Sequence, residues 1–180
     1  PWPPFMSYGV ADQDGKLANC TPIEIPGPRL PHDMAITENY SILMDLPIFQ
    51  DPAVKNKWRA GFFPELPARF GVIPRHGSGD QIRWFDAEPC YIYHTINAWE
   101  EEGEVVMVAC RTANPIPTPD PANGKWAVMM ANLKLFATLH EWRFNLETGE
   151  TKERQLDDQG SEFPMINLSR LGQASQYSYN

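Results

Sequence analysis

The sequence predicts an all-β fold, and three observations support that prediction. Short runs rich in β-branched and aromatic residues recur throughout the 180 residues. Gly, Pro, Asn and Asp, which are typical of turns, separate these runs. The longest apolar runs, such as 105–110, have the length of a strand and fall far short of the roughly 20 residues that a membrane-spanning helix needs. Consecutive hairpins of this kind are typical of a meander, a sandwich or a series of propeller blades.

Most of these runs occur in pairs around a turn, so we expect them to form β-hairpins. The pairs are 7–11 with 16–25, 69–74 with 81–85, 90–99 with 104–112, and 133–146 with 151–156. The run 40–46 is expected to be a further strand. Segment 51–66 shows little alternation and is expected to be a loop with a short helical turn. Segment 114–123 contains four prolines and is expected to be a surface loop, whereas 125–132 is compatible with a helix or an extended segment.

The composition excludes some classes of partner. The formal net charge of −8 at pH 7 would repel the phosphates of a nucleic acid. The three cysteines are odd in number and show no Cys-x-x-Cys spacing, so neither a zinc ribbon nor a disulfide framework is indicated. We therefore expect reduced thiols and a cytoplasmic location, with a pairing among the cysteines left open.

The two ends of the sequence suggest a piece of a longer protein. The chain begins at Pro1 without an initiating Met and stops in the aromatic run 176–180. At 180 residues it is long enough for one domain with a sizeable core. We therefore expect residues 1–180 to form a single domain that is an internal fragment, without the N-terminal and C-terminal parts of the longer chain.

Two of the four histidines, His32 and His94, lie within or beside apolar, strand-like runs. A buried imidazole needs a hydrogen-bond partner, because burial removes its contact with water. Neutral imidazole is also the commonest metal ligand in proteins. Alternation along a strand places His94 on one face with Cys90, Ile92 and Ile96, pointing into a dry environment. The residues alone therefore indicate either a core histidine or a metal ligand.

The histidines also have simpler interpretations. Each of the two could be a core histidine bonded to a backbone carbonyl, and His32 could instead bond the adjacent Asp33. His76 lies in a glycine-rich turn, and His140 lies in a strand beside Glu141, which suggests a solvated face. We expect both at the surface, so we reject a single site built from all four histidines of this chain.

Five segments of the sequence carry recognisable patterns. They are 31–40 (PHDMAITENY), 69–75 (RFGVIPR), 82–85 (IRWF), 94–100 (HTINAWE) and 162–167 (EFPMIN). In this order they resemble the carotenoid cleavage oxygenase family, which includes apocarotenoid and lignostilbene dioxygenases and the retinoid isomerase of the vertebrate eye. The resemblance runs from about Tyr8 to the end of the chain.

The resemblance implies a seven-bladed β-propeller, of which this chain would form about three to four blades. It also implies a mononuclear Fe(II) on the propeller axis, held by four histidines with three glutamates behind them. His32 matches the second histidine ligand and His94 the third. Glu162 matches one of the glutamates, the one bonded to His94, where an outer carboxylate would fix the tautomer of the imidazole. The first and fourth ligands would lie outside this chain.

The function that the resemblance implies is that of an Fe(II)-dependent dioxygenase. Such an enzyme uses O2 to cleave a conjugated carbon–carbon double bond of a carotenoid, apocarotenoid or stilbenoid to two carbonyl products. We expect the chain alone to be inactive. The alternatives are the retinoid-isomerase-like branch of the family and a metal-free β-propeller binding module.

Two further expectations can be checked against a structure. Peripheral membrane contact is a family trait, and Trp58, Phe62 and Phe63 could form an apolar surface patch or pack under a loop. The iron hypothesis itself requires that His32 and His94 converge on a common point and that neither imidazole turns toward bulk water.

Overall fold

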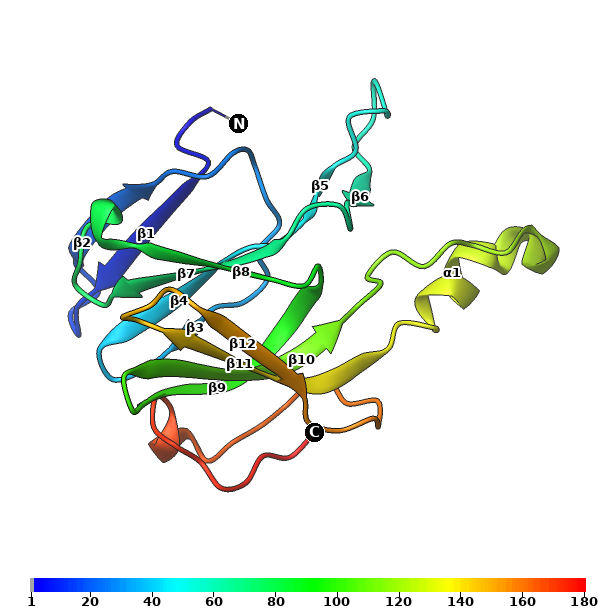
Figure 1. Cartoon of the computed structure of the whole chain (residues 1–180). Coiled ribbons are helices and arrows are strands. Elements are labelled where there is room, and N and C mark those ends of the chain that lie inside the picture. Colours follow the sequence, from blue (N-terminus) through cyan, green and yellow to red (C-terminus); the bar gives the residue numbers. More distant parts are fainter. Residues whose placement is uncertain (1) are drawn as a thin grey trace.

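Antiparallel strands are the main regular elements of the computed structural model, which describes residues 2–180. They form two four-stranded sheets and two separate hairpins (Figure 1). Within the described residues, α1 (Ala127–Asn132) is the one α-helix, and no helix there is long and apolar enough to cross a bilayer. The all-β prediction is therefore confirmed. Pro1, with which the predicted domain begins, lies outside the described residues.

In the first sheet the predicted strands 40–46 and 69–74 are confirmed, the predicted strand 81–85 is shifted by two residues, and the short strand 35–36 was not predicted. Its spatial order is β3 (Ala35–Ile36), β4 (Tyr40–Asp45), β7 (Ala68–Pro74) and β8 (Arg83–Ala87), with the 3-10 turn η1 (Gly79–Gln81) between the last two. The predicted hairpin of β1 (Met6–Ala11) and β2 (Leu17–Ile23) lies beside this sheet (Figure 1). Gly15 closes its turn at φ 76°, which is a conformation that glycine adopts at little cost. The hydroxyl of Tyr8 donates a hydrogen bond to the carbonyl oxygen of Arg75 and so joins the hairpin to the sheet.

The second sheet is a simple meander. Its spatial order is β12 (Thr151–Gln155), β11 (Ala137–Asn145), β10 (Glu104–Thr112) and β9 (Tyr91–Glu101). Gly103 at φ 83° allows the tight turn between β9 and β10. Four antiparallel strands in sequence order are also the make-up of a propeller blade. No sheet closes on itself among residues 2–180, and the number of blades stays a prediction.

The core lies between the two sheets. Phe70 and Phe85 of the first sheet meet Trp142 and Phe144 of the second, with ring centroids 5.2–5.4 Å apart. All four side chains are almost completely buried. Truncation of one buried aromatic to alanine costs about 3–5 kcal/mol, so this aromatic cluster is a main source of stability.

Segment 51–66 differs from its prediction. It holds no helical turn; β5 (Ile48–Gln50) pairs with β6 (Ala60–Phe62) and turns it into a β-hairpin. Contacts between residues far apart in the sequence explain the difference, because Phe63, one residue beyond β6, stacks on Phe49 of β5 with ring centroids 4.2 Å apart. Phe63 thus packs under the loop, whereas Trp58 is exposed.

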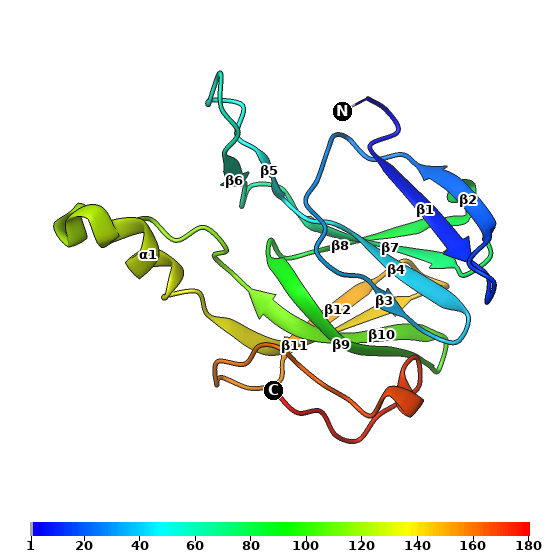
Figure 2. The same ribbon diagram turned by 180° about the vertical axis from the view of Figure 1, so that it is seen from behind.

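The chain between β10 and β11 projects away from both sheets as an arm (Figures 1 and 2). It carries the 3-10 segment η2 (Pro121–Trp126) and α1, so the helical alternative for residues 125–132 is the correct one. The following strand begins at Ala137, four residues later than predicted. After β12 the chain contains the 3-10 turn η3 (Leu168–Arg170) and an isolated antiparallel bridge between Met165 and Tyr179, and it runs along the second sheet (Figure 2).

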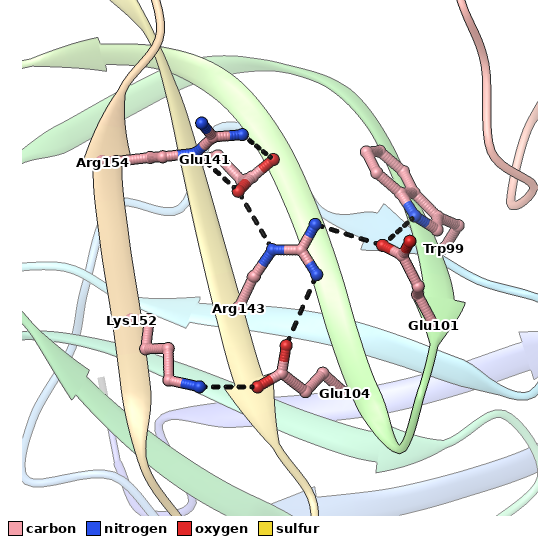
Figure 3. A network of polar contacts seen from close by, with 7 residues as sticks. All are labelled: Trp99, Glu101, Glu104, Glu141, Arg143, Lys152 and Arg154. Carbon is pink, nitrogen blue, oxygen red and sulfur yellow. Dashed lines mark hydrogen bonds and ion pairs between the residues drawn. The ribbon is translucent and has the colours of Figure 1, made fainter.

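A network of charged side chains covers the outward face of the second sheet (Figure 3). Arg143 donates hydrogen bonds to Glu141, Glu101 and Glu104, and Arg154 binds the same Glu141 carboxylate. Burial raises the pKa of Glu141, but the hydrogen bonds from Arg154 and Arg143 outweigh it, so the net pKa is lowered. The expectation of a solvated face at Glu141 is wrong, because guanidinium groups replace water and leave it 7% exposed.

Candidate metal centre

A pocket of about 400 Å³ opens where the second sheet meets the segments around His32 and Glu162. Its lining comes from β9, from the end of β10, from the start of β11 and from the C-terminal segment. The lining residues are His32, Tyr93, His94, Thr112, Leu135, Phe136, Ala137, Glu162 and Phe163. The structure therefore brings all three residues of the predicted site into one cavity.

His94 faces this pocket because β9 is bulged. Arg111 of β10 pairs with Ile92, and the next recorded pair joins Ala109 to Thr95. Between these pairs the chain advances three residues along β9 but only two along β10, so β9 contains one extra residue. The extra residue turns Tyr93 and His94 toward the same cavity. The predicted alternation is wrong here, because Ile92 is fully buried while the His94 side chain is 30% exposed. Bulges commonly redirect side chains beside functional sites in this way.

The carboxylate of Glu162 contacts the Nδ1 nitrogen of the His94 ring. Its Oε2 lies 2.7 Å from Nδ1 of His94 and also accepts a hydrogen bond from the backbone N–H of Phe163. The carboxylate is an acceptor, so this contact assigns the imidazole proton to Nδ1 and leaves a lone pair on Nε2. No described residue hydrogen-bonds to that Nε2 atom. A neutral imidazole with a free lone pair is the form that binds metals.

His32 converges with His94, as the iron hypothesis requires. The two ring centroids are 5.2 Å apart with perpendicular planes, and the Tyr93 ring lies 5.6 Å from His32. The second requirement, that neither imidazole turns toward bulk water, is not met for His32 within residues 2–180, because this side chain lines the pocket but is exposed there. The iron hypothesis can therefore hold only if the rest of the longer protein covers this ring. Among the described residues, the alternative partner Asp33 makes no hydrogen bond to the His32 imidazole; its carboxylate accepts from Met34 and Thr95.

The donor atoms in this pocket fit a metal only as part of a larger set. Imidazole nitrogens suit iron, zinc, copper and nickel, and a carboxylate behind an imidazole is the usual outer contact of a metal-bound histidine. Oε1 of Glu162 is buried without a hydrogen-bond partner, which leaves polar capacity inside the site. Within residues 2–180, however, no group of three or more His, Cys, Asp or Glu is arranged to hold an ion. The metal roles of His32, His94 and Glu162 stay predictions.

The other two histidines lie outside the pocket lining. His76 is exposed, as predicted. His140 is not; it is 8% exposed, its ring lies 4.6 Å from that of Trp142, and its Nε2 is 3.4 Å from Oε2 of Glu153. The surface prediction for His140 is wrong because its side chain points to the aromatic core, while Glu141 points to the opposite, charged face.

Tyr93 and Phe136 also line the pocket, and no local pattern in the sequence indicates that they do. Tyr93 enters the lining only through the bulge, and burial, followed by the charge of Glu162, raises the pKa of its phenol. Phe136 belongs to the arm, far from the histidines in sequence, and its apolar ring closes one side of the cavity. The three cysteines are free, as predicted, and Cys90 and Cys110 are buried.

Known proteins with related sequences match nearly the whole of this chain. The family model described as retinal pigment epithelial membrane protein matches residues 2–180. Carotenoid 9,10(9',10')-cleavage dioxygenase 1 of Pisum sativum is 42% identical over 180 residues, covering 98% of this chain and 32% of that protein. Isoeugenol monooxygenase of Pseudomonas nitroreducens is 31% identical, covering 98% of this chain and 37% of that protein.

A solved structure agrees with these sequence relatives. The lignostilbene dioxygenase of Pseudomonas brassicacearum superposes with a TM-score of 0.76 at 26% identity, covering 96% of this chain and 36% of that one. The chain thus spans about a third of the length of the relatives it matches.

Proposed function

Because this chain belongs to the retinal pigment epithelial membrane protein family, the carotenoid cleavage oxygenases, we propose that it is part of an Fe(II)-dependent dioxygenase. The whole protein would use O2 to cleave a conjugated carbon–carbon double bond of a carotenoid, apocarotenoid or stilbenoid to two carbonyl products. Residues 1–180 would be one domain and supply about three to four blades of a seven-bladed propeller. The free cysteines fit the predicted cytoplasmic location.

The observation that carries this proposal is the convergence of His32 and His94 in one pocket with Glu162 behind His94. His32 and His94 would hold the metal, together with ligands from the rest of the longer protein. Glu162 would keep the proton on Nδ1 of His94, so that Nε2 presents its lone pair to the cavity. Bound Fe(II) would supply the redox chemistry that activates O2.

The remaining lining suits a lipophilic substrate. Leu135, Phe136 and Phe163 present apolar surface to the cavity beside the two histidines. Apolar and aromatic side chains of this kind can pack on the flat π-system of a polyene or a stilbene. The protein would therefore position the double bond near the metal, which is the contribution expected of a cofactor-dependent enzyme.

Product analysis on the full-length protein tests the proposed reaction. The protein, loaded with Fe(II), is given a carotenoid, an apocarotenoid or a stilbene under ¹⁸O2, and the products are identified by mass spectrometry. We expect two carbonyl products that both carry the label. An isomerised product without label would favour the retinoid-isomerase-like branch, and a protein that binds no iron and turns over none of these substrates would favour the metal-free module. Either result contradicts the proposal.

A further inference from the structure

The segment that carries His32 lies alongside β9 and is tied to it at three places. The hydroxyl of Tyr91 donates to the carbonyl oxygen of Leu30, at a sequence separation of 61. Thr95 donates to Asp33 at a separation of 62, which is also the separation of the two histidines. Further along, Glu100 accepts hydrogen bonds from residues 37 and 39, at separations of 63 and 61. The two segments therefore run in the same direction with a nearly constant offset.

The middle tie is the one that adjoins the candidate site. Oδ2 of Asp33 accepts hydrogen bonds from both the backbone N–H and the hydroxyl of Thr95, each 2.7 Å long. Oδ1 of the same carboxylate accepts from the backbone N–H of Met34 at 2.7 Å. Asp33 directly follows His32, and Thr95 directly follows His94. The residues next to the two imidazoles are thus bonded to each other.

These bonds act where the backbone has least other support. Residues 27–34 form no strand, so β-ladder hydrogen bonds do not fix the position of His32. On the other side, Thr95 follows the bulge that turns His94 toward the pocket. An ionised carboxylate that accepts two short bonds from one residue is a strong and directional link. It joins the two irregular pieces of backbone that present the histidines.

We propose that Asp33 is a positioning residue, whose carboxylate sets the separation and relative orientation of the His32 and His94 imidazoles through its two hydrogen bonds to Thr95. This inference rests on the proposed function and specifies how its metal site is assembled. Asp33 and Glu162 would act on the histidines in different ways. Glu162 contacts a ring nitrogen of His94, whereas Asp33 links the backbone segments that carry His32 and His94.

The Glu100 tie provides an internal control for a merely structural role. Glu100 joins the same two segments with three hydrogen bonds, from the hydroxyl of Thr37 and from the backbone and side-chain nitrogens of Asn39. It lies at the far end of the contact, beyond the histidines. If Asp33 only fastened one segment to the other, loss of either tie would have the same consequences for metal binding.

The test uses the full-length protein and Co(II) as the probe, because Co(II) is stable in air and its visible absorption reports coordination geometry. Four variants are compared: Asp33→Ala, Thr95→Val, Thr95→Ser and Glu100→Ala. Co(II) affinity is measured by competition with a chelator, and thermal unfolding of the metal-free protein gives the stability of each variant.

We expect Asp33→Ala, which removes both acceptor oxygens, to weaken Co(II) binding about 10- to 100-fold, as loss of an outer contact typically does, and to change the Co(II) absorption spectrum. Thr95→Val removes one of the two bonds and should shift both readouts the same way by a smaller amount. Thr95→Ser keeps both donors and should stay within about twofold of wild type. Glu100→Ala should lower the Tm of the metal-free protein and leave Co(II) affinity and spectrum unchanged.

The outcomes separate this inference from the function on which it rests. Wild-type protein that binds neither Co(II) nor Fe(II) contradicts the proposed function. Wild-type protein that binds metal, with Asp33→Ala and Thr95→Val indistinguishable from it, overturns the positioning role alone. So does a Glu100→Ala variant that loses as much affinity as Asp33→Ala. If Asp33→Ala fails to fold, the Thr95→Val and Thr95→Ser pair decides, because a positioning role requires that these two differ in affinity.

Discussion

Two histidines of the second sheet, His94 and His140, each lie beside a glutamate, and the two pairs differ in their surroundings. In the pair of His94 and Glu162 each side chain is 30% exposed, and Nδ1 lies 2.7 Å from the carboxylate. In the pair of His140 and Glu153 the side chains are 11% and 21% exposed, the N–O distance is 3.4 Å, and neither imidazole nitrogen has a well-formed hydrogen bond. The first pair opens into a cavity that holds a second imidazole, whereas the second pair packs on Trp142.

The difference comes from the strands that carry the two histidines. The strand β11 pairs with β10 without interruption, so His140 keeps the alternation and points into the aromatic core. The strand β9 is bulged beside His94, which therefore leaves the alternation and reaches the pocket. The same two residue types thus give a pocket-lining imidazole with a short contact to a carboxylate in one place and a longer contact beside the aromatic core in the other.

The aromatic partners of the two pairs should show the largest difference in stability. Trp142 is fully buried and donates a hydrogen bond to Glu153, whereas Phe163, which lies 4.9 Å from the His94 ring, is 79% exposed. We expect Trp142→Ala to lower the free energy of unfolding by about 3–5 kcal/mol and Phe163→Ala by no more than about 0.5 kcal/mol. Chemical unfolding of the full-length variants measures both, and equal losses would refute the distinction.

The two glutamates should differ in their effect on metal affinity. Glu162→Gln keeps the shape of the side chain but weakens its hold on the Nδ1 proton of His94, so we expect iron affinity to fall about 10- to 100-fold. Glu153→Gln makes the same chemical change in the buried pair and should leave iron affinity unchanged. Chelator competition on both variants makes the comparison, and a matching loss in Glu153→Gln would show that the effect is not specific to the pocket.

The buried pair should instead show a small, pH-dependent effect on stability. Burial raises the pKa of Glu153, but contacts with His140 and the backbone N–H of Glu88 outweigh it, so the folded pKa lies below its ordinary value near 4.5. The ionised carboxylate therefore stabilises the fold above that ordinary value, and this contribution is lost as the pH falls through the folded pKa. We expect Glu153→Gln to cost about 1 kcal/mol at pH 7 and progressively less as the pH falls below the ordinary glutamate pKa. A cost that does not change with pH would contradict this explanation.

Sequence reasoning predicted the regular strands well, because their signals are local. The hairpin around Gly103 follows from alternation and turn chemistry, and both strands occur within a few residues of their predicted bounds. The hairpin of β5 and β6, which spans residues 48–62, was missed, since its strands are only three residues long and the stacking of Phe63 on Phe49 is not visible in local alternation. The bulge in β9 was missed for a similar reason, because register is a property of a strand and its partner.

In the candidate site, the identity of the residues could be predicted from the sequence, but their burial could not. His32, His94 and Glu162 came from a resemblance of ordered segments, and the structure brings them into one pocket. Their exposure was not predictable, because it depends on how far the cavity is open. The burial of His140 was misjudged from its neighbour Glu141, whose charge is compensated by arginines of β11 and β12 that lie two and thirteen residues away.

The iron content of single-histidine variants tests the central claim most directly. The full-length protein is prepared as wild type, His32→Ala, His94→Ala and the exposed control His76→Ala, and folding is checked by circular dichroism before metal analysis. We expect wild type and His76→Ala to hold iron at equal levels and each of the other two variants to lose it. Iron at the wild-type level in folded His32→Ala or His94→Ala would show that the two imidazoles do not share a metal.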